Sequence, residues 1–128
     1  MRKRQAVLML IVCGSAFFMQ GCTAALLVGA GAGTVAYLKG DLNAVMSEDV
    51  GHIYEAALKA LDELEIATTK RQKDALSAVI VGRTIEDKKI TIKLKSTKDK
   101  LTKLSIRVGI VGDETMSRTI YEQIKQNL

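Results

Sequence analysis

Aromatic side chains, thiols and histidines are scarce in this chain of 128 residues. It has no tryptophan, and behind Cys22 it has no phenylalanine and no further cysteine. Sites for sugars, bases and flat cofactors usually stack their ligand on aromatic rings, so such sites are not expected here. Without a thiol, the segment behind residue 22 can form neither an internal disulfide nor a cysteine-based metal site or nucleophile. The composition therefore predicts a domain that folds on its apolar core alone, with no cofactor and no metal.

Residues typical of catalytic sites are equally few. His52, the single histidine, falls in the first turn of an acidic predicted helix, where a solvated surface role explains it better than a role as base or metal ligand. Asp113 and Glu114 are sequence neighbours that would point apart on a helix, so capping explains them better than paired-carboxylate catalysis. Ser105 and Ser117 have no candidate base near them in the sequence. We therefore expect a protein that is not an enzyme.

The amino terminus has the organisation of a lipoprotein signal peptide. Residues 2–4 are Arg-Lys-Arg, a positive n-region, and Ala6–Met19 is an apolar stretch of 14 residues. This length suits a signal peptide and is short for a membrane span. The sequence Met-Gln-Gly-Cys that follows, ending at Cys22, resembles a lipobox, at which bacterial lipoprotein precursors are acylated on the cysteine and cleaved before it. Cys22 is therefore the expected site of lipidation.

These features divide the chain into three parts. We expect residues 1–21 to be the signal peptide, residues 22–34 a lipidated Gly/Ala-rich tether, and residues 35–128 a single domain. Acyl chains on Cys22 would anchor the protein to a membrane. Thr23, which is not aspartate, favours the periplasmic face of the outer membrane, by resemblance to the sorting rule of Gram-negative lipoproteins. Export also excludes nucleic acid as a partner.

Other interpretations of this region stay open. Cleavage after Ala24 would release a free protein, and an uncleaved segment continued by residues 24–38 would serve as a membrane anchor. The spacing of Gly29 and Gly33 is typical of helices that pack closely in membranes, so this segment could lie on the membrane, pack on the domain or act as a plain tether. A dinucleotide-binding loop is excluded, because Thr34 stands where the motif requires its last glycine.

The hydrophobic periodicity of the domain switches between strand and helix spacing in a defined order. The expected elements are a strand at Tyr37–Val45 with a possible bulge at Gly40, a helix that Ser47 caps and that extends to Glu65, strands at Ile66–Lys70, Leu76–Thr84, Ile90–Lys95 and Leu104–Ile110, and a helix that Asp113 caps. This order of strand, helix, four strands and helix predicts an α+β fold. Its antiparallel sheet of about five strands would have two helices on one face and water on the other.

Charge is distributed unevenly along the domain. Loss of the signal peptide leaves 16 basic and 14 acidic side chains, a balance that by itself implies no polyanionic partner. Residues 88–107 nevertheless hold eight basic side chains against Asp99 alone, whereas residues 48–65 hold six acids against Lys59. Four of the basic residues are expected on the side of the sheet away from the core: Lys93, Lys95, Lys103 and Arg107. They form either an ordinary solvated face that resists aggregation or a contact surface for anionic headgroups or an acidic partner.

Two segments of the sequence resemble a known family. They are residues 31–42 (Gly-Ala-Gly-Thr-Val-Ala-Tyr-Leu-Lys-Gly-Asp-Leu) and residues 106–114 (Ile-Arg-Val-Gly-Ile-Val-Gly-Asp-Glu), and the family is one of short Gram-negative lipoproteins classed as a domain of unknown function. The resemblance implies lipidation and a shared small fold, and it implies no activity. The order of elements is also similar to helix-grip domains, including those of an accessory lipoprotein of the outer-membrane-protein assembly machine, a likeness of topology alone.

Two functions are compatible with these observations. The sequence favours a non-enzymatic cell-envelope lipoprotein that acts through contacts with an envelope protein or with the membrane surface. The alternative is a lipid- or small-ligand-binding module that uses a groove between the sheet and the helices. A domain of this size usually fills its core with its own side chains, which argues against a large internal cavity.

Overall fold

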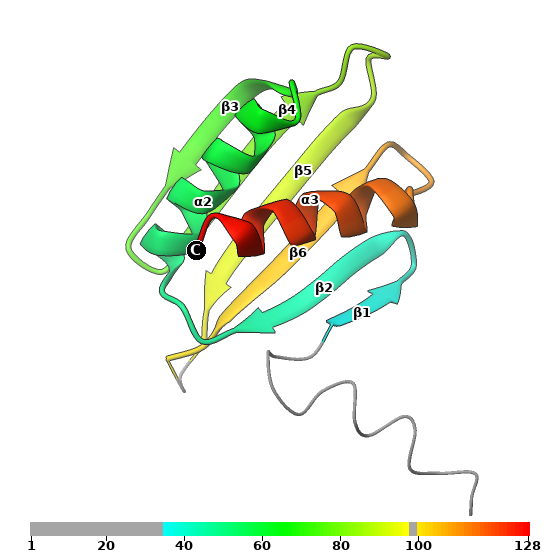
Figure 1. Ribbon diagram of the computed structural model, residues 1–128. Coiled ribbons are helices and arrows are strands. Elements are labelled where there is room, and N and C mark those ends of the chain that lie inside the picture. The colour runs from blue at the N-terminus through cyan, green and yellow to red at the C-terminus, as the bar shows by residue number, and fades with distance from the viewer. Residues whose placement is uncertain (1–34, 98–99) are drawn as a thin grey trace, which may run out of the picture. The chain divides into compact units, whose positions relative to one another are not determined.

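The computed structural model describes residues 35–97 and 100–128, so the expected signal peptide, Cys22 and tether lie outside the described residues. The described part is an antiparallel sheet with two helices on one face (Figure 1). In chain order its elements are β1 (Val35–Leu38), β2 (Asp41–Met46), α2 (Val50–Glu63), β3 (Ala67–Lys73), β4 (Ser77–Arg83), β5 (Lys89–Ser96), β6 (Thr102–Val108) and α3 (Glu114–Gln126). The α+β class predicted from the sequence is confirmed. None of the helices within the described ranges is long and apolar enough to cross a membrane.

The sheet has six strands in the order β1-β2-β6-β5-β4-β3, and every neighbouring pair is antiparallel. The central strands β5 and β6 alternate as the sequence predicts. Ile92 and Ile106 face each other across the strand pair and are fully buried. The residues between the apolar positions of these strands turn to the opposite face, because successive side chains of a strand point to opposite sides.

The expected first strand is in fact a hairpin, which raises the strand count from about five to six. Lys39 and Gly40 both have positive φ angles, 53° and 86°, as the favoured two-residue turn between antiparallel strands requires. Leu38 therefore pairs with Asp41 across the turn and lies on the side away from the helices. The alternation in the sequence continues through residue 40 and predicts that Leu38 and Leu42 share a face. A two-residue turn instead places Leu38 on the same face as Asp41 and opposite to Leu42. Leu38 is consequently 63% exposed and does not join the core.

The two helices begin at aspartate caps and cover the same face of the sheet (Figure 1). Asp113 caps α3 as predicted, since its side chain accepts a hydrogen bond from the N–H of Met116 at 3.0 Å. For α2 the predicted cap, Ser47, is wrong: the cap is Asp49, whose carboxylate accepts from the N–H of His52 at 3.2 Å. Helix α2 packs on β3, β4 and β5, whereas α3 packs on β6 and β2.

The core lies between the helices and the sheet. Ile53 and Leu61 of α2 and Ile120 of α3 are fully buried against the apolar side of the strands. Three small residues of α2 are also buried, Ala56, Ala57 and Ala60, and they allow this helix to approach the sheet closely.

The last strand ends earlier than the sequence predicts. Strand β6 stops at Val108, because Gly109 adopts a φ of +71° and turns the chain out of the sheet. Ile110, predicted to continue the buried face, is 91% exposed, and Val111 beside it is 87% exposed. The connection between β6 and α3 thus displays two aliphatic side chains, of which the alternation assigned Ile110 to the interior.

Candidate functional site

The side of the sheet away from α2 and α3, here named the open face, collects the basic residues of the domain. The strand register places seven cations on it: Lys70, Arg83, Lys89, Lys93, Lys95, Lys103 and Arg107. Among the strand residues that point to the open face, the acidic side chain is that of Asp41 on β2. Antiparallel pairing brings these side chains together from strands that are well separated in the sequence.

Three of the predicted contact residues form one cluster on adjacent strands. Lys95 lies directly opposite Lys103, and Lys93 lies opposite Ser105, one step along the same face. All three lysines are exposed, and they make no hydrogen bond or ion pair with any other described residue. Like charges that face each other across a strand pair repel, so this arrangement costs stability unless an anion lies close by.

The three lysines border a shallow groove of about 420 Å³ that opens to solvent. Ala36 and Val45 give the groove an apolar part, while Asn43 and Ser105 add an amide and a hydroxyl group. The groove therefore offers three ammonium groups beside a small apolar surface. This combination suits a phosphate group attached to an apolar body, as in a lipid headgroup region.

Arg107, the fourth predicted residue, forms hydrogen bonds with other residues of the domain. Its Nη1 donates to Asp41 Oδ1 at 2.9 Å and to the backbone oxygen of Lys39 at 3.2 Å, and its Nη2 donates to the backbone oxygen of Ile110. The guanidinium thereby ties the β1–β2 turn to the connection between β6 and α3. Arg107 shares the open face with the lysines, but its geometry is that of a structural residue.

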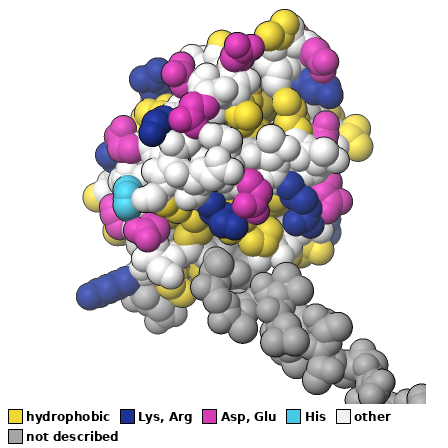
Figure 2. Space-filling model, in the orientation of Figure 1, with side chains coloured by type: hydrophobic (Ala, Val, Ile, Leu, Met, Phe, Trp, Pro, Cys, Tyr) yellow, Lys and Arg dark blue, Asp and Glu magenta, His cyan; other side chains and the backbone are white. Residues whose placement is uncertain are grey.

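Acidic residues gather on the opposite side of the molecule. The six carboxylates of residues 48–65 belong to α2 or to the residues that flank it, and α2 lies on the helix-covered face. Figure 2, which views the molecule from the helix side, shows acidic side chains spread over that surface. Basic side chains, among them Lys73 and Lys125, lie between these acids on the helix side, so that side carries charges of both signs, whereas the open face is mainly basic.

The remaining candidates from the sequence stay apart from the lysine cluster. His52 is exposed on α2, and its Nδ1 lies 3.0 Å from Glu48 Oε2. Ser117 is buried on α3, and its hydroxyl has no hydrogen-bond partner among the described residues. Within residues 35–97 and 100–128, no group of three or more His, Cys, Asp or Glu side chains is placed to hold a metal ion.

A groove between the sheet and a helix, as the ligand-binding alternative requires, occurs between α2 and β3. Its volume is about 530 Å³, and Leu58 and Ile66 form its apolar part. Charged side chains of both signs also line it, among them Glu55, Lys59 and Arg71. Such a mixed lining differs from the predominantly apolar lining of typical small-molecule sites.

Sequence reasoning missed three cations of the open face. Lys70, Arg83 and Lys89 share the face with the lysine cluster. Lys89 stands one residue before the predicted strand, at a position of the same parity as Lys93 and Lys95, so extending the alternation by one residue would have found it. Lys70 follows a shift of strand register between Thr68 and Lys70, which no pattern in the sequence marks.

The two segments that carry the family resemblance meet in space where the structure describes them. A Cβ atom at Gly112 would lie 2.5 Å from the Cα of Gly40, and a Cβ at Gly40 would lie 2.6 Å from the backbone oxygen of Val111. Only glycine permits this approach, so each of the two turns needs a glycine at the point where the other turn contacts it. Arg107 and Asp41 complete the contact from the two segments.

Comparison with known proteins identifies the family of this chain. A search of curated proteins finds no match to the chain. A family match extends over residues 5–127, nearly the whole chain, and so includes both segments. The chain belongs to the family described as "Protein of unknown function (DUF3568)".

Proposed function

We propose that the protein is a non-enzymatic lipoprotein of the cell envelope whose domain contacts anionic headgroups through the open face. In this proposal Cys22 carries the lipid anchor, and the domain lies at the periplasmic face of the outer membrane. The observation that carries the proposal is the cluster of Lys93, Lys95 and Lys103, which have no anionic partner among the described residues.

The expected strength of such a contact is modest. A basic residue close to an anionic membrane contributes about 1 kcal/mol within a Debye length of the surface. Three lysines would then contribute about 3 kcal/mol, roughly a hundredfold in partition. A contact of this strength orients a domain that an anchor already holds nearby, and it weakens as the salt concentration rises.

The acidic residues of the helix-covered side also favour an orientation in which the open face meets the membrane. The acids of α2 and its flanks lie on the helix-covered side, opposite the lysines. An anionic surface attracts the mainly basic open face more strongly than the helix side, where acids offset the cations, and this difference favours one orientation.

Lipidation is tested by metabolic labelling with a fatty acid. The protein should carry the label, and Cys22→Ala should abolish it, because the acyl chains are attached at this thiol. Label that persists in Cys22→Ala would refute the anchor.

The headgroup contact is tested on a fragment that begins at Val35, which retains every residue of the described core. Circular dichroism first establishes that the fragment is folded. It should co-sediment with vesicles of phosphatidylcholine and phosphatidylglycerol at low salt and be released as salt rises. Changing Lys93, Lys95 and Lys103 together to Gln should lower the partition roughly a hundredfold.

A matched control separates this cluster from net charge. Changing Lys59, Lys73 and Lys125 together to Gln removes the same charge from α2, β3 and α3, outside the open face. This variant should retain most of the binding. Equal binding by the wild type and the open-face variant, or equal loss in both variants, would refute the proposed contact.

A further inference from the structure

Large aliphatic side chains stand in solvent at one end of the sheet. They are Leu38, Ile85, Ile110 and Val111, with exposed fractions of 63%, 87%, 91% and 87%. Leu38 ends β1 beside the β1–β2 turn, Ile85 lies in the β4–β5 turn, and Ile110 and Val111 lie in the β6–α3 connection. The antiparallel register places these three regions at the same end of the sheet. We name this group of four side chains the apolar end.

The connection that carries Ile110 and Val111 is built to display them. Glycines with positive φ stand on either side of the pair, Gly109 at +71° and Gly112 at +96°, and they turn the chain away from the core. Arg107 Nη2 donates a hydrogen bond to the backbone oxygen of Ile110 in this connection. The two positive φ angles and this hydrogen bond therefore favour the backbone conformation that exposes both side chains.

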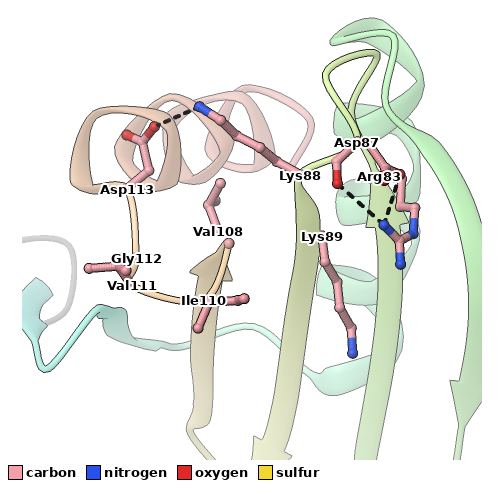
Figure 3. Close-up of a pocket in the computed structure, with 10 residues that line it drawn as sticks. Arg83, Asp87, Lys88, Lys89, Val108, Ile110, Val111, Gly112 and Asp113 are labelled. Atoms are coloured by element: carbon pink, nitrogen blue, oxygen red, sulfur yellow. Dashed lines mark hydrogen bonds and ion pairs between the residues drawn. The ribbon is translucent and has the colours of Figure 1, made fainter.

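Charges around the apolar end are largely neutralised. A groove of about 740 Å³ separates the β4–β5 turn from the β6–α3 connection. Figure 3 shows Asp87 paired with Arg83 and Asp113 paired with Lys88 at its rim, with separations of 2.8 and 3.7 Å. Lys89 points along the sheet without a partner among the residues drawn. The rim thus presents no unpaired carboxylate from these two aspartates to an approaching anionic surface.

We propose that the apolar end inserts into the interface of a lipid bilayer, an inference that rests on the headgroup contact proposed above. Leu38 and Lys89 lie on the open face, so the aliphatic side chains and the cations can meet the same surface when the domain is tilted. Aliphatic tips then enter the boundary between headgroups and acyl chains, while the ammonium groups stay among the phosphates.

A bilayer suits this surface better than a protein partner. Stable protein interfaces bury about 800 Å² on each partner around a continuous apolar centre. The apolar end instead consists of tips in three separate regions of the chain, and the ion pair between Lys88 and Asp113 lies between two of them. Separate tips fit a fluid surface, which closes around each one.

The absence of tryptophan makes the insertion directly measurable. Single variants Ile110→Trp and Ile85→Trp of the full chain are reconstituted into phosphatidylcholine–phosphatidylglycerol vesicles, with and without bromine on the acyl chains. Leu76→Trp is the control, because Leu76 is also exposed but lies in the β3–β4 turn at the opposite end of the sheet. Circular dichroism establishes that each variant is folded.

The fluorescence of Ile110→Trp and of Ile85→Trp should shift to shorter wavelength and be quenched by the brominated lipid, whereas the Leu76→Trp control should emit as in water. Emission of the tip variants equal to that of the control would overturn the insertion, even if the lysine variants confirm the headgroup contact. Quenching at the tips combined with unaltered binding of the lysine variant would refute the role of the lysines and leave the insertion standing. A blue shift that depends on protein concentration and needs no lipid would assign the apolar end to a second copy and overturn the proposal.

Discussion

Substitution of Gly112 by alanine tests whether the two family segments depend on their close contact. Gly112 and Gly109 lie in the same connection and both have positive φ angles, but their surroundings differ. An added Cβ at Gly109 would meet nothing within 4 Å, whereas one at Gly112 would lie 2.5 Å from backbone atoms of Gly40 and 2.6 Å from the hydroxyl of Tyr37. The pair of variants thus separates the cost of backbone conformation from the cost of the clash.

The structure gives the expected size of each effect. Alanine in the left-handed region costs about 1–2 kcal/mol, and Gly109→Ala should lose only this amount. Gly112→Ala adds an overpacking cost of about 1–3 kcal/mol, because the backbone of Gly40 cannot move without displacing the β1–β2 turn. For a domain of this size, 1 kcal/mol corresponds to about 4–8 °C in Tm.

Thermal unfolding followed by circular dichroism measures both variants against the wild type. Gly112→Ala should melt at least about 4 °C below Gly109→Ala. Equal Tm values for the two variants would show that the contact between the turns contributes nothing, and the packing argument would be refuted. A Gly109→Ala variant that melts below Gly112→Ala would place the constraint in backbone conformation alone.

Two further predictions concern the core and the pairing of the helices. Leu61→Asp and Ile106→Asp should each lower the free energy of unfolding by more than about 4 kcal/mol, because each places an unpaired charge in the core. Lys95→Asp on the open face should leave the free energy of unfolding nearly unchanged. Urea titration compares the three variants, and an equal loss of stability in Lys95→Asp would mean that the side chains of β5 face the other way. A hydrogen bond from Asn127 lowers the pKa of Glu63 below 4.5, so this carboxylate stabilises the domain above the ordinary carboxyl range and the contribution is lost as the pH falls through the lowered pKa. The Tm difference between the wild type and Glu63→Gln should therefore shrink below pH 4.5, and a difference that grows on acidification would contradict this linkage.

Local patterns predicted the elements that local physics determines. The strict alternation of β5 and β6 and the aspartate before α3 each depend on residues within a few positions, and each was confirmed. The β1–β2 hairpin was missed because its turn, Lys39-Gly40, carries only one of the residues that mark such turns in a sequence. Ile110 was assigned to the core because alternation alone does not reveal that Gly109 ends the strand.

The candidate site was predictable in part for the same reason. Strand parity placed Lys93, Lys95 and Lys103 on one side of the sheet, and the structure has them there. The engagement of Arg107 could not be foreseen, because its acceptors on Asp41 and Lys39 lie 66 and 68 residues away in the sequence. Contacts of that range depend on the strand order, in which β2 lies beside β6, and no local spacing encodes this order.

The strand order also explains how β6 contributes residues to the open face and leads into the apolar end. Strand β6 lies in the interior of the sheet, so its outward side chains belong to the centre of the open face, and its end leads directly into the apolar end. Arg107, the last outward residue of β6, stands where the two surfaces meet and is engaged in internal hydrogen bonds, not with a ligand. A free cation there would leave the β6–α3 connection without its anchor, and Ile110 could fold back on the sheet. In the proposed membrane contact the lysines would therefore meet the headgroups, while the hydrogen bonds of Arg107 hold the connection that carries Ile110 and Val111.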